Sequence, residues 1–92
     1  MSSKRRTKIE IVHDILKSIQ NKGGEIKPTH LLYKSNLSHK KMMEYIEDLL
    51  SKEMISEINC EGNKLYGITN KGLQYLVEFK QIQKFSNAFG IN

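Results

Sequence analysis

The stretch LLYKSNLSHKKMMEYIEDLLSKEMI (residues 31–55) contains two helical patterns separated by a short polar turn. The first pattern begins at Pro28, which suits the first position of a helix, and ends at Asn36, which tolerates the left-handed conformation. The second begins after Ser38, whose hydroxyl can cap a helix, and its apolar residues recur at helical spacing. These residues are Met42, Ile46, Leu49 and Leu50, with Tyr45 beside them. Two helices joined by so short a turn predict a helix-turn-helix.

The segment that precedes this pair predicts one more helix. In TKIEIVHDILKSIQNKGG (residues 7–24), Thr7 and Glu10 have the spacing of a capping box, and Ile, Leu and Val recur every three to four residues. The pair Gly23–Gly24 ends the pattern.

After Lys52 the pattern changes from helical to strand-like. MISEINC (residues 54–60) and KLYGIT (residues 64–69) are rich in Ile and Tyr. Between them, Gly62 and Asn63 are expected to supply the positive φ angles of a tight hairpin. Thr69 then caps a last helix over residues 70–89. Its inward-facing residues are expected to be Leu73, Leu76 and Val77.

The element order is therefore α-α-α-β-β-α. We expect a mainly α (α+β) fold, the winged helix-turn-helix, in which the hairpin is the wing and the C-terminal helix is extended. Residues 7–92 are expected to form this single domain, and residues 1–6 a flexible basic arm.

The start of the helix after Ser38 has an unusual charge pattern. His39, Lys40 and Lys41 stand at the positive end of the helix dipole, where each exposed cation costs roughly 0.3–1 kcal/mol. One explanation is that these residues bind a polyanion, which would relieve the cost. The other is that they form ion pairs along a solvated face, and Lys40 and Glu44 have the required spacing.

Three motifs give the sequence a family resemblance: YKSNLS (residues 33–38), YIEDLL (residues 45–50) and ITNKG (residues 68–72). Together they resemble the small archaeal winged-helix DNA-binding proteins of the Sso10a type and related archaeal transcriptional regulators. The resemblance implies that double-stranded DNA is the partner. It also implies that the last helix pairs antiparallel with its copy in a second subunit. Because the chain stops at Asn92, we expect the contact between the two paired helices to be short.

The DNA-binding residues follow if the second helix of the pair enters the major groove. Bases or phosphates are expected to contact its start, and further phosphates the preceding turn, the hairpin and the N-terminal arm. The predicted set is Lys34, Ser35, Ser38, His39, Lys40, Lys41, Met43, Glu44, Asn63, Lys64, Lys4, Arg5 and Arg6.

A second apolar stripe in the last helix suggests a homodimer. Tyr75, Phe79, Ile82, Ser86 and Phe89 are spaced 4, 3, 4 and 3 residues apart, as in a heptad seam. The dimer interface is predicted to consist of Tyr75, Phe79, Ile82, Phe85 and Phe89.

The charge distribution leaves two functions open. The net charge is +5, but the excess is N-terminal: residues 1–27 have seven basic and three acidic side chains, whereas residues 28–53 have four of each. Basicity favours a DNA-binding transcription regulator or chromatin-associated factor. The balanced charge of residues 28–53 favours an alternative, a winged-helix module that binds a protein partner and no DNA.

Other classes of function find no support in the sequence. The three histidines and Cys60 lack metal-ligand spacing, and no phosphate-binding loop or nucleophile with a neighbouring base occurs. We therefore expect no enzyme, no metal, no cofactor and no small-molecule ligand. Cys60 is expected to be a small apolar residue of the hairpin. No apolar run reaches the length of about 18 residues that a membrane span needs, so a cytoplasmic protein is predicted.

Overall fold

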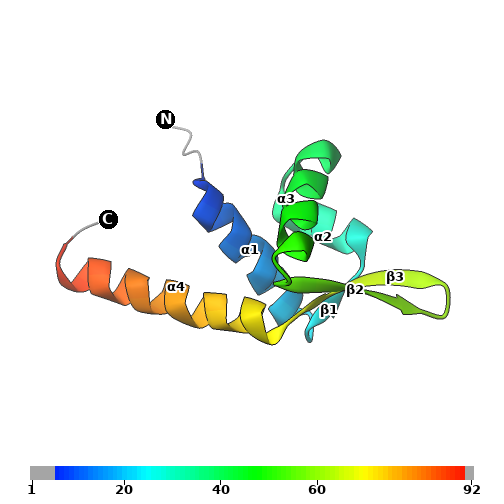
Figure 1. Ribbon diagram of the computed structural model, residues 1–92. Coiled ribbons are helices and arrows are strands. Elements are labelled where there is room, and N and C mark those ends of the chain that lie inside the picture. The colour runs from blue at the N-terminus through cyan, green and yellow to red at the C-terminus, as the bar shows by residue number, and fades with distance from the viewer. Residues whose placement is uncertain (1–5, 91–92) are drawn as a thin grey trace.

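A computed structural model describes residues 6–90 and shows the predicted winged helix-turn-helix with one additional strand (Figure 1). The elements in chain order are α1 (Lys8–Asn21), β1 (Glu25–Ile26), α2 (Pro28–Ser35), α3 (His39–Ser51), β2 (Ile55–Cys60), β3 (Asn63–Ile68) and α4 (Asn70–Ala88). The order is therefore α-β-α-α-β-β-α. It differs from the predicted order only by β1, which was not predicted.

Local capping fixes the start of three helices, as predicted. At α1 the box is complete: the Thr7 hydroxyl accepts from the Glu10 N–H at 3.2 Å, and the Glu10 carboxylate accepts from the Thr7 N–H at 2.8 Å. Ser38 caps α3 and Thr69 caps α4 through their hydroxyl oxygens. Asn36 ends α2 with a φ of 60°, in the left-handed region expected for it.

The three strands form one antiparallel sheet in the order β1-β3-β2. β1 pairs with the inner end of β3, where Ile26 lies opposite Tyr66. The hairpin turn differs from the prediction: Glu61 and Gly62 have φ angles of 52° and 82°, while Asn63 already pairs with Cys60 as the first residue of β3. Cys60 itself is exposed next to the turn, so it does not act as an apolar packing residue.

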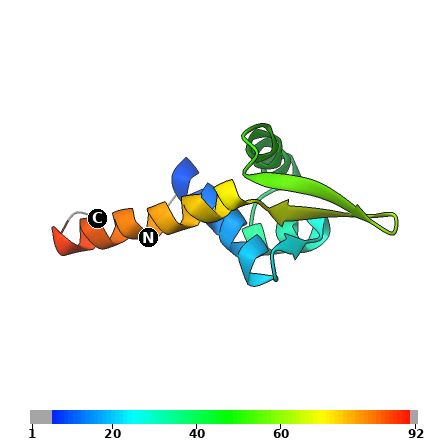
Figure 2. The ribbon, with the colours of Figure 1, turned by 60° about the horizontal axis from the view of Figure 1, so that its bottom comes forward.

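The core lies between α1, α2, α3 and the inner end of the sheet. Its buried residues are Val12, Ile15, Leu16, Ile19, Ile26, Leu31, Met42, Ile46, Leu49, Met54, Ile55, Tyr66 and Leu76. From α4 only Leu76 is in this set, and Val77 is 56% exposed, which corrects the prediction that Val77 faces inward. The reason is that α4 contacts the domain through the face that carries Tyr75, Leu76 and Phe79, and only its C-terminal part extends away from the body of the domain (Figure 2).

The ITNKG motif forms the junction between α4 and the end of α3. The Thr69 hydroxyl donates to the Glu53 carbonyl at 2.7 Å, and the Thr69 N–H donates to the Met54 carbonyl at 3.2 Å. Gly72 packs so tightly here that a Cβ would clash with the Met54 carbonyl oxygen and lie 2.8 Å from Cγ1 of Ile68. The motif therefore fixes the helix against backbone groups of the segment that follows α3.

Candidate nucleic-acid interface

The first turn of α3 is a small, positively charged surface. The Ser38 hydroxyl accepts from the Lys41 N–H at 3.1 Å and holds the turn, and His39, Lys40 and Lys41 are all exposed. No acidic residue lies in that turn. In Figure 1, α3 begins at its end farthest from the sheet and runs down to β2. The unfavourably placed cations thus face solvent.

Beyond that first turn, the charged side chains of α3 are all acidic. The helix has two lysines and three carboxylates, a formal charge of −1 with histidine neutral. Glu44 pairs with Lys41 at 3.7 Å, not with Lys40 as the spacing had suggested. Among residues 6–90, Lys40 has no ion-pair partner. Met43 is half-buried and Glu44 is exposed, so Glu44 is the more accessible of these two predicted contacts.

At the turn before α3, one predicted phosphate contact is accessible and the other is not. Lys34 is exposed in the last turn of α2. Ser35 is only 2% exposed; its hydroxyl donates to the Leu32 carbonyl at 3.1 Å and accepts from the Leu37 N–H at 3.4 Å. The predicted phosphate contact from this hydroxyl is therefore corrected, because Ser35 holds the turn together instead.

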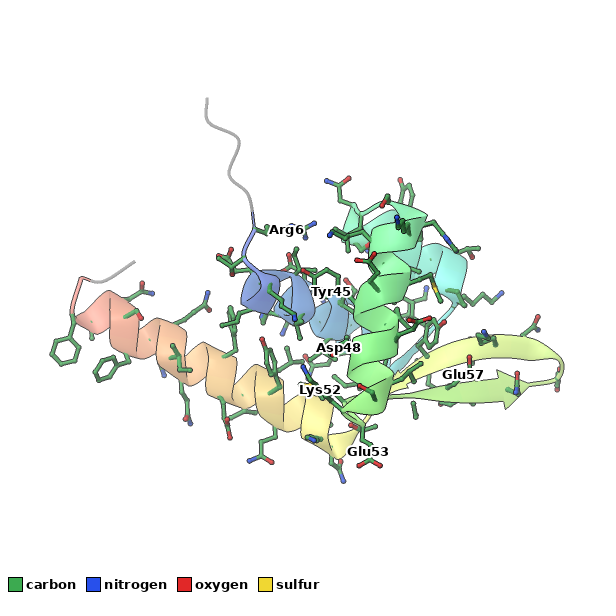
Figure 3. All side chains as sticks on the ribbon, turned by 45° about the horizontal axis from the view of Figure 1, so that its top comes forward. Arg6, Tyr45, Asp48, Lys52, Glu53 and Glu57 are labelled. Atoms are coloured by element: carbon green, nitrogen blue, oxygen red, sulfur yellow. The ribbon has the colours of Figure 1, made fainter. Side chains whose placement is uncertain are left out.

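Arg6 belongs to the folded domain and not to a flexible arm. Its guanidinium donates to the Asp14 carboxylate at 2.7 Å and to the Ser35 carbonyl at 2.9 Å (Figure 3). These bonds tie the start of α1 to the turn before α3, so the expected arm boundary at residue 6 is corrected. Lys4 and Arg5, the other predicted arm contacts, lie outside the described residues.

The wing offers less positive charge than its sequence suggested. The Lys64 ammonium lies 2.9 Å from the Glu57 carboxylate on the neighbouring strand. This hydrogen bond, with the charges of Tyr66 and Glu57, raises the pKa of Lys64 above its ordinary value. Asn63 is exposed at the start of β3. The wing therefore presents the exposed amides of Asn59 and Asn63, the exposed carboxylate of Glu61, and a lysine whose charge is balanced by Glu57.

Near α3, the exposed residue Tyr33 was missed in the sequence, and the place of Lys8 beside α3 was not expected. Tyr33 is 85% exposed on α2, beside Lys34. Its position two residues after Leu31 places it on the outer side of α2, which is a readable signal. Lys8 from α1 lines a hollow of about 320 Å³ together with Lys41, Glu44, Tyr45 and Asp48 of α3. That proximity arises from helix packing, so no local pattern could have revealed it.

The predicted dimer seam is divided in the structure. Near the start of α4, the Tyr75 hydroxyl donates to the Ile9 carbonyl at 3.1 Å, and the Phe79 ring stacks on His13 with centroids 4.2 Å apart. Both residues therefore pack against α1 of the same chain. Farther along, Ile82, Phe85 and Phe89 are 66%, 62% and 66% exposed.

Neither a metal cluster nor a membrane-spanning helix is found in residues 6–90. Within this range, no group of three or more His, Cys, Asp or Glu side chains could hold a metal ion. None of the helices in the described part of the chain combines the length and apolar character needed to cross a bilayer.

Comparison with known sequences identifies the family. The model of the winged helix-turn-helix family matches residues 5–87. The uncharacterized protein MJ0290 of Methanocaldococcus jannaschii is 35% identical over 82 residues, covering 89% of this chain and 36% of that protein. The chain thus spans about a third of the length of this relative.

Three solved structures share the fold. Sso10a-2, a DNA-binding protein from Sulfolobus solfataricus, has a TM-score of 0.75 at 21% identity, covering 91% of this chain and 85% of that one. F93 from STIV, a winged-helix DNA-binding protein, has a TM-score of 0.73 at 19% identity and coverages of 87% and 92%. Bordetella bronchiseptica BpsR, whose DNA binding is regulated by 6-hydroxynicotinic acid, has a TM-score of 0.67 at 15% identity and coverages of 100% and 72%.

The expected resemblance to the Sso10a type is confirmed by these likenesses. At such identities the solved structures establish the fold alone, whereas the sequence match covers nearly all of the domain. The chain belongs to the winged helix-turn-helix family.

Proposed function

We propose that this protein binds double-stranded DNA, with the first turn of α3 in the major groove, and acts as a transcription regulator or chromatin-associated factor without enzymatic activity. The observation that carries the proposal is the exposed cluster of His39, Lys40 and Lys41 at the positive end of a helix dipole. A phosphate or an acceptor on a base edge relieves this repulsion on binding. All three solved structures compared above belong to proteins that are described as binding DNA.

The accessible residues define a compact footprint. Lys34 lies just before the turn and Tyr33 beside it, so α2 can contact the backbone next to the groove that α3 enters. Asn63 supplies a polar contact from the wing, while Lys64 must first exchange its bond to Glu57. DNA binding requires the compartment that holds the DNA, which is the cytoplasm in archaea such as the source of the relative MJ0290.

The acidic side chains beyond the first turn of α3 favour one competing function, a module that binds a protein partner. Because α3 as a whole has a net charge of −1, only its first turn attracts a polyanion. The two functions differ in their affinity for DNA: a protein-binding module has no duplex affinity near micromolar concentration, even at low salt.

The test is fluorescence anisotropy on a labelled duplex with the double variant Lys40→Glu and Lys41→Glu. The control is Lys71→Glu with Lys80→Glu, which makes the same charge change on exposed positions of α4 outside the proposed dimer contact. We expect the α3 variant to lose most of its affinity. The slope of log K against log salt should become shallower by roughly 0.9 for each phosphate that the variant no longer neutralises. If the α3 variant binds the duplex as tightly as the control variant and the wild type, the proposed role of α3 is refuted.

We further propose a homodimer through the end of α4. Ile82, Phe85 and Phe89 are more than half exposed, and apolar clusters of this kind on a monomer commonly mark an interface. A hollow of about 380 Å³ between Ile9 and Glu10 of α1 and this part of α4 offers room for partner side chains.

Light scattering coupled to size exclusion tests this dimer with Phe85→Glu and Phe89→Glu. Gln81→Glu, also exposed on α4, is the control. We expect the first pair to yield a monomer and the control to keep the dimer. A monomeric wild-type chain at tens of micromolar would rule the interface out.

A further inference from the structure

A hollow of about 260 Å³ lies where α1, α3, α4 and the segment between α3 and β2 meet. It is lined by Lys8, Ile9, Val12, Asp48, Leu49, Lys52, Met54 and Tyr75. Figure 3 shows Asp48 and Lys52 on the side of α3 that faces α1 and α4. The hollow does not include the exposed first turn of α3. A second hollow lies next to it, shares Lys8 and Asp48 with it, and is also lined by Lys41 from that first turn.

The floor of the hollow is apolar and rigid. Val12 of α1, Leu49 of α3 and Met54 from the segment between α3 and β2 all belong to the buried core. The Tyr75 hydroxyl already donates a hydrogen bond to the Ile9 carbonyl, so Tyr75 contributes its ring to the hollow and not a free polar group. Such a floor suits an apolar group and offers it no hydrogen bond.

The rim, in contrast, has an excess of positive charge. The Lys52 ammonium lies 3.0 Å from the Asp48 carboxylate, so these two charges balance. Lys8 has no carboxylate within ion-pair distance anywhere in residues 6–90. In the adjoining hollow, Glu44 is already paired with Lys41. Lys8 is therefore the unbalanced charge at the border of both hollows.

We propose that this hollow binds a small monocarboxylate with an apolar body, either one ring or a short acyl chain. The carboxylate binds the Lys8 ammonium, and the body lies on Val12, Leu49 and Met54. At about 260 Å³ the hollow is just below the roughly 300–1,000 Å³ of typical ligand pockets, which limits the ligand to this small size. This proposal does not depend on DNA binding, so failure of one proposal leaves the other intact.

Titration by ¹H–¹⁵N NMR tests the site on the full chain, with sodium benzoate and sodium hexanoate as probes. Benzylamine has a ring of the same size with the opposite charge and serves as the control ligand. We expect saturable shifts at the amides of residues 8–12 and 48–54 with both carboxylates, and none there with benzylamine.

Lys8→Met keeps the apolar stem and removes the charge, and it is expected to weaken benzoate binding by about tenfold or more because a charge-assisted hydrogen bond is removed. Lys17→Met, an exposed position on the same helix, is expected to bind like the wild type. Equal shifts with benzylamine, unchanged affinity in Lys8→Met, or the absence of saturable shifts with either carboxylate would each overturn the proposal.

Discussion

Replacing Gly72 by alanine should destabilise the protein, although the same change in an ordinary helix is favourable by roughly 0.8–1 kcal/mol. The added methyl group would meet the Met54 carbonyl oxygen and lie 2.8 Å from Cγ1 of Ile68. The carbonyl cannot simply withdraw, because it accepts the Thr69 N–H at 3.2 Å. Overpacking of this kind typically costs about 1–3 kcal/mol. With backbone in the way we take the upper half of that range, which leaves a net loss of about 1–2 kcal/mol.

Thermal unfolding followed by circular dichroism measures this loss. For a domain of this size, 1 kcal/mol shifts the melting temperature by roughly 4–8 °C, so Gly72→Ala should melt about 4–16 °C below the wild type. Lys71→Ala, at the exposed neighbouring position, should change stability by no more than about 0.5 kcal/mol. A Gly72→Ala variant as stable as the wild type would show that the junction is not tightly packed.

Two further substitutions test contacts that join distant segments. Arg6→Ala removes both guanidinium hydrogen bonds. Because the guanidinium is one-third exposed, we expect the free energy of unfolding, measured in urea, to fall by only about 0.5–1.5 kcal/mol. Arg6→Lys should restore little of this stability, since an ammonium cannot reproduce the planar group that reaches both Asp14 and the Ser35 carbonyl. Burial raises the pKa of Tyr75, so the folded chain keeps this proton at a pH where the unfolded chain loses it. The stabilisation is complete below a pH of about 10 and is lost as the pH rises through the raised pKa. Above a pH of about 10, the urea midpoint of Tyr75→Phe should therefore fall less steeply with pH than that of the wild type. An alkaline slope identical in the two proteins would exclude Tyr75 as its source.

The features that could be predicted from the sequence are those with short-range causes. The caps at Thr7, Ser38 and Thr69 each bond a backbone N–H three residues away, and Asn36 ends its helix through its own conformational preference. Such interactions leave a pattern within one turn of chain. That is why the helix starts and the helix-turn-helix followed directly from spacing and residue type.

The features that could not be predicted depend on segments far apart in the chain. β1 has only two residues, too few for any periodicity, and exists because β3 offers it a partner edge. Arg6 looked like part of a basic arm, but its partner Ser35 lies 29 residues away. Likewise, Lys64 is less available than its sequence position suggests, because the hairpin register brings Glu57 next to it. Charge counts alone therefore overstated the free positive surface.

The division of the α4 stripe predicts a specific dimer geometry. Because Tyr75 and Phe79 are already packed against α1, only residues 82–89 remain for a partner, an overlap of roughly 12 Å at 1.5 Å per residue. Two antiparallel copies joined over this length would hold their Thr69 junctions about 48 Å apart, whereas overlap of the whole helix would bring them to about 30 Å. Spin labels at Lys71→Cys, in a chain that also has Cys60→Ser, would distinguish these distances by double electron–electron resonance. The shorter distance would mean that Tyr75 and Phe79 leave α1 when the dimer forms, which contradicts the packing described above.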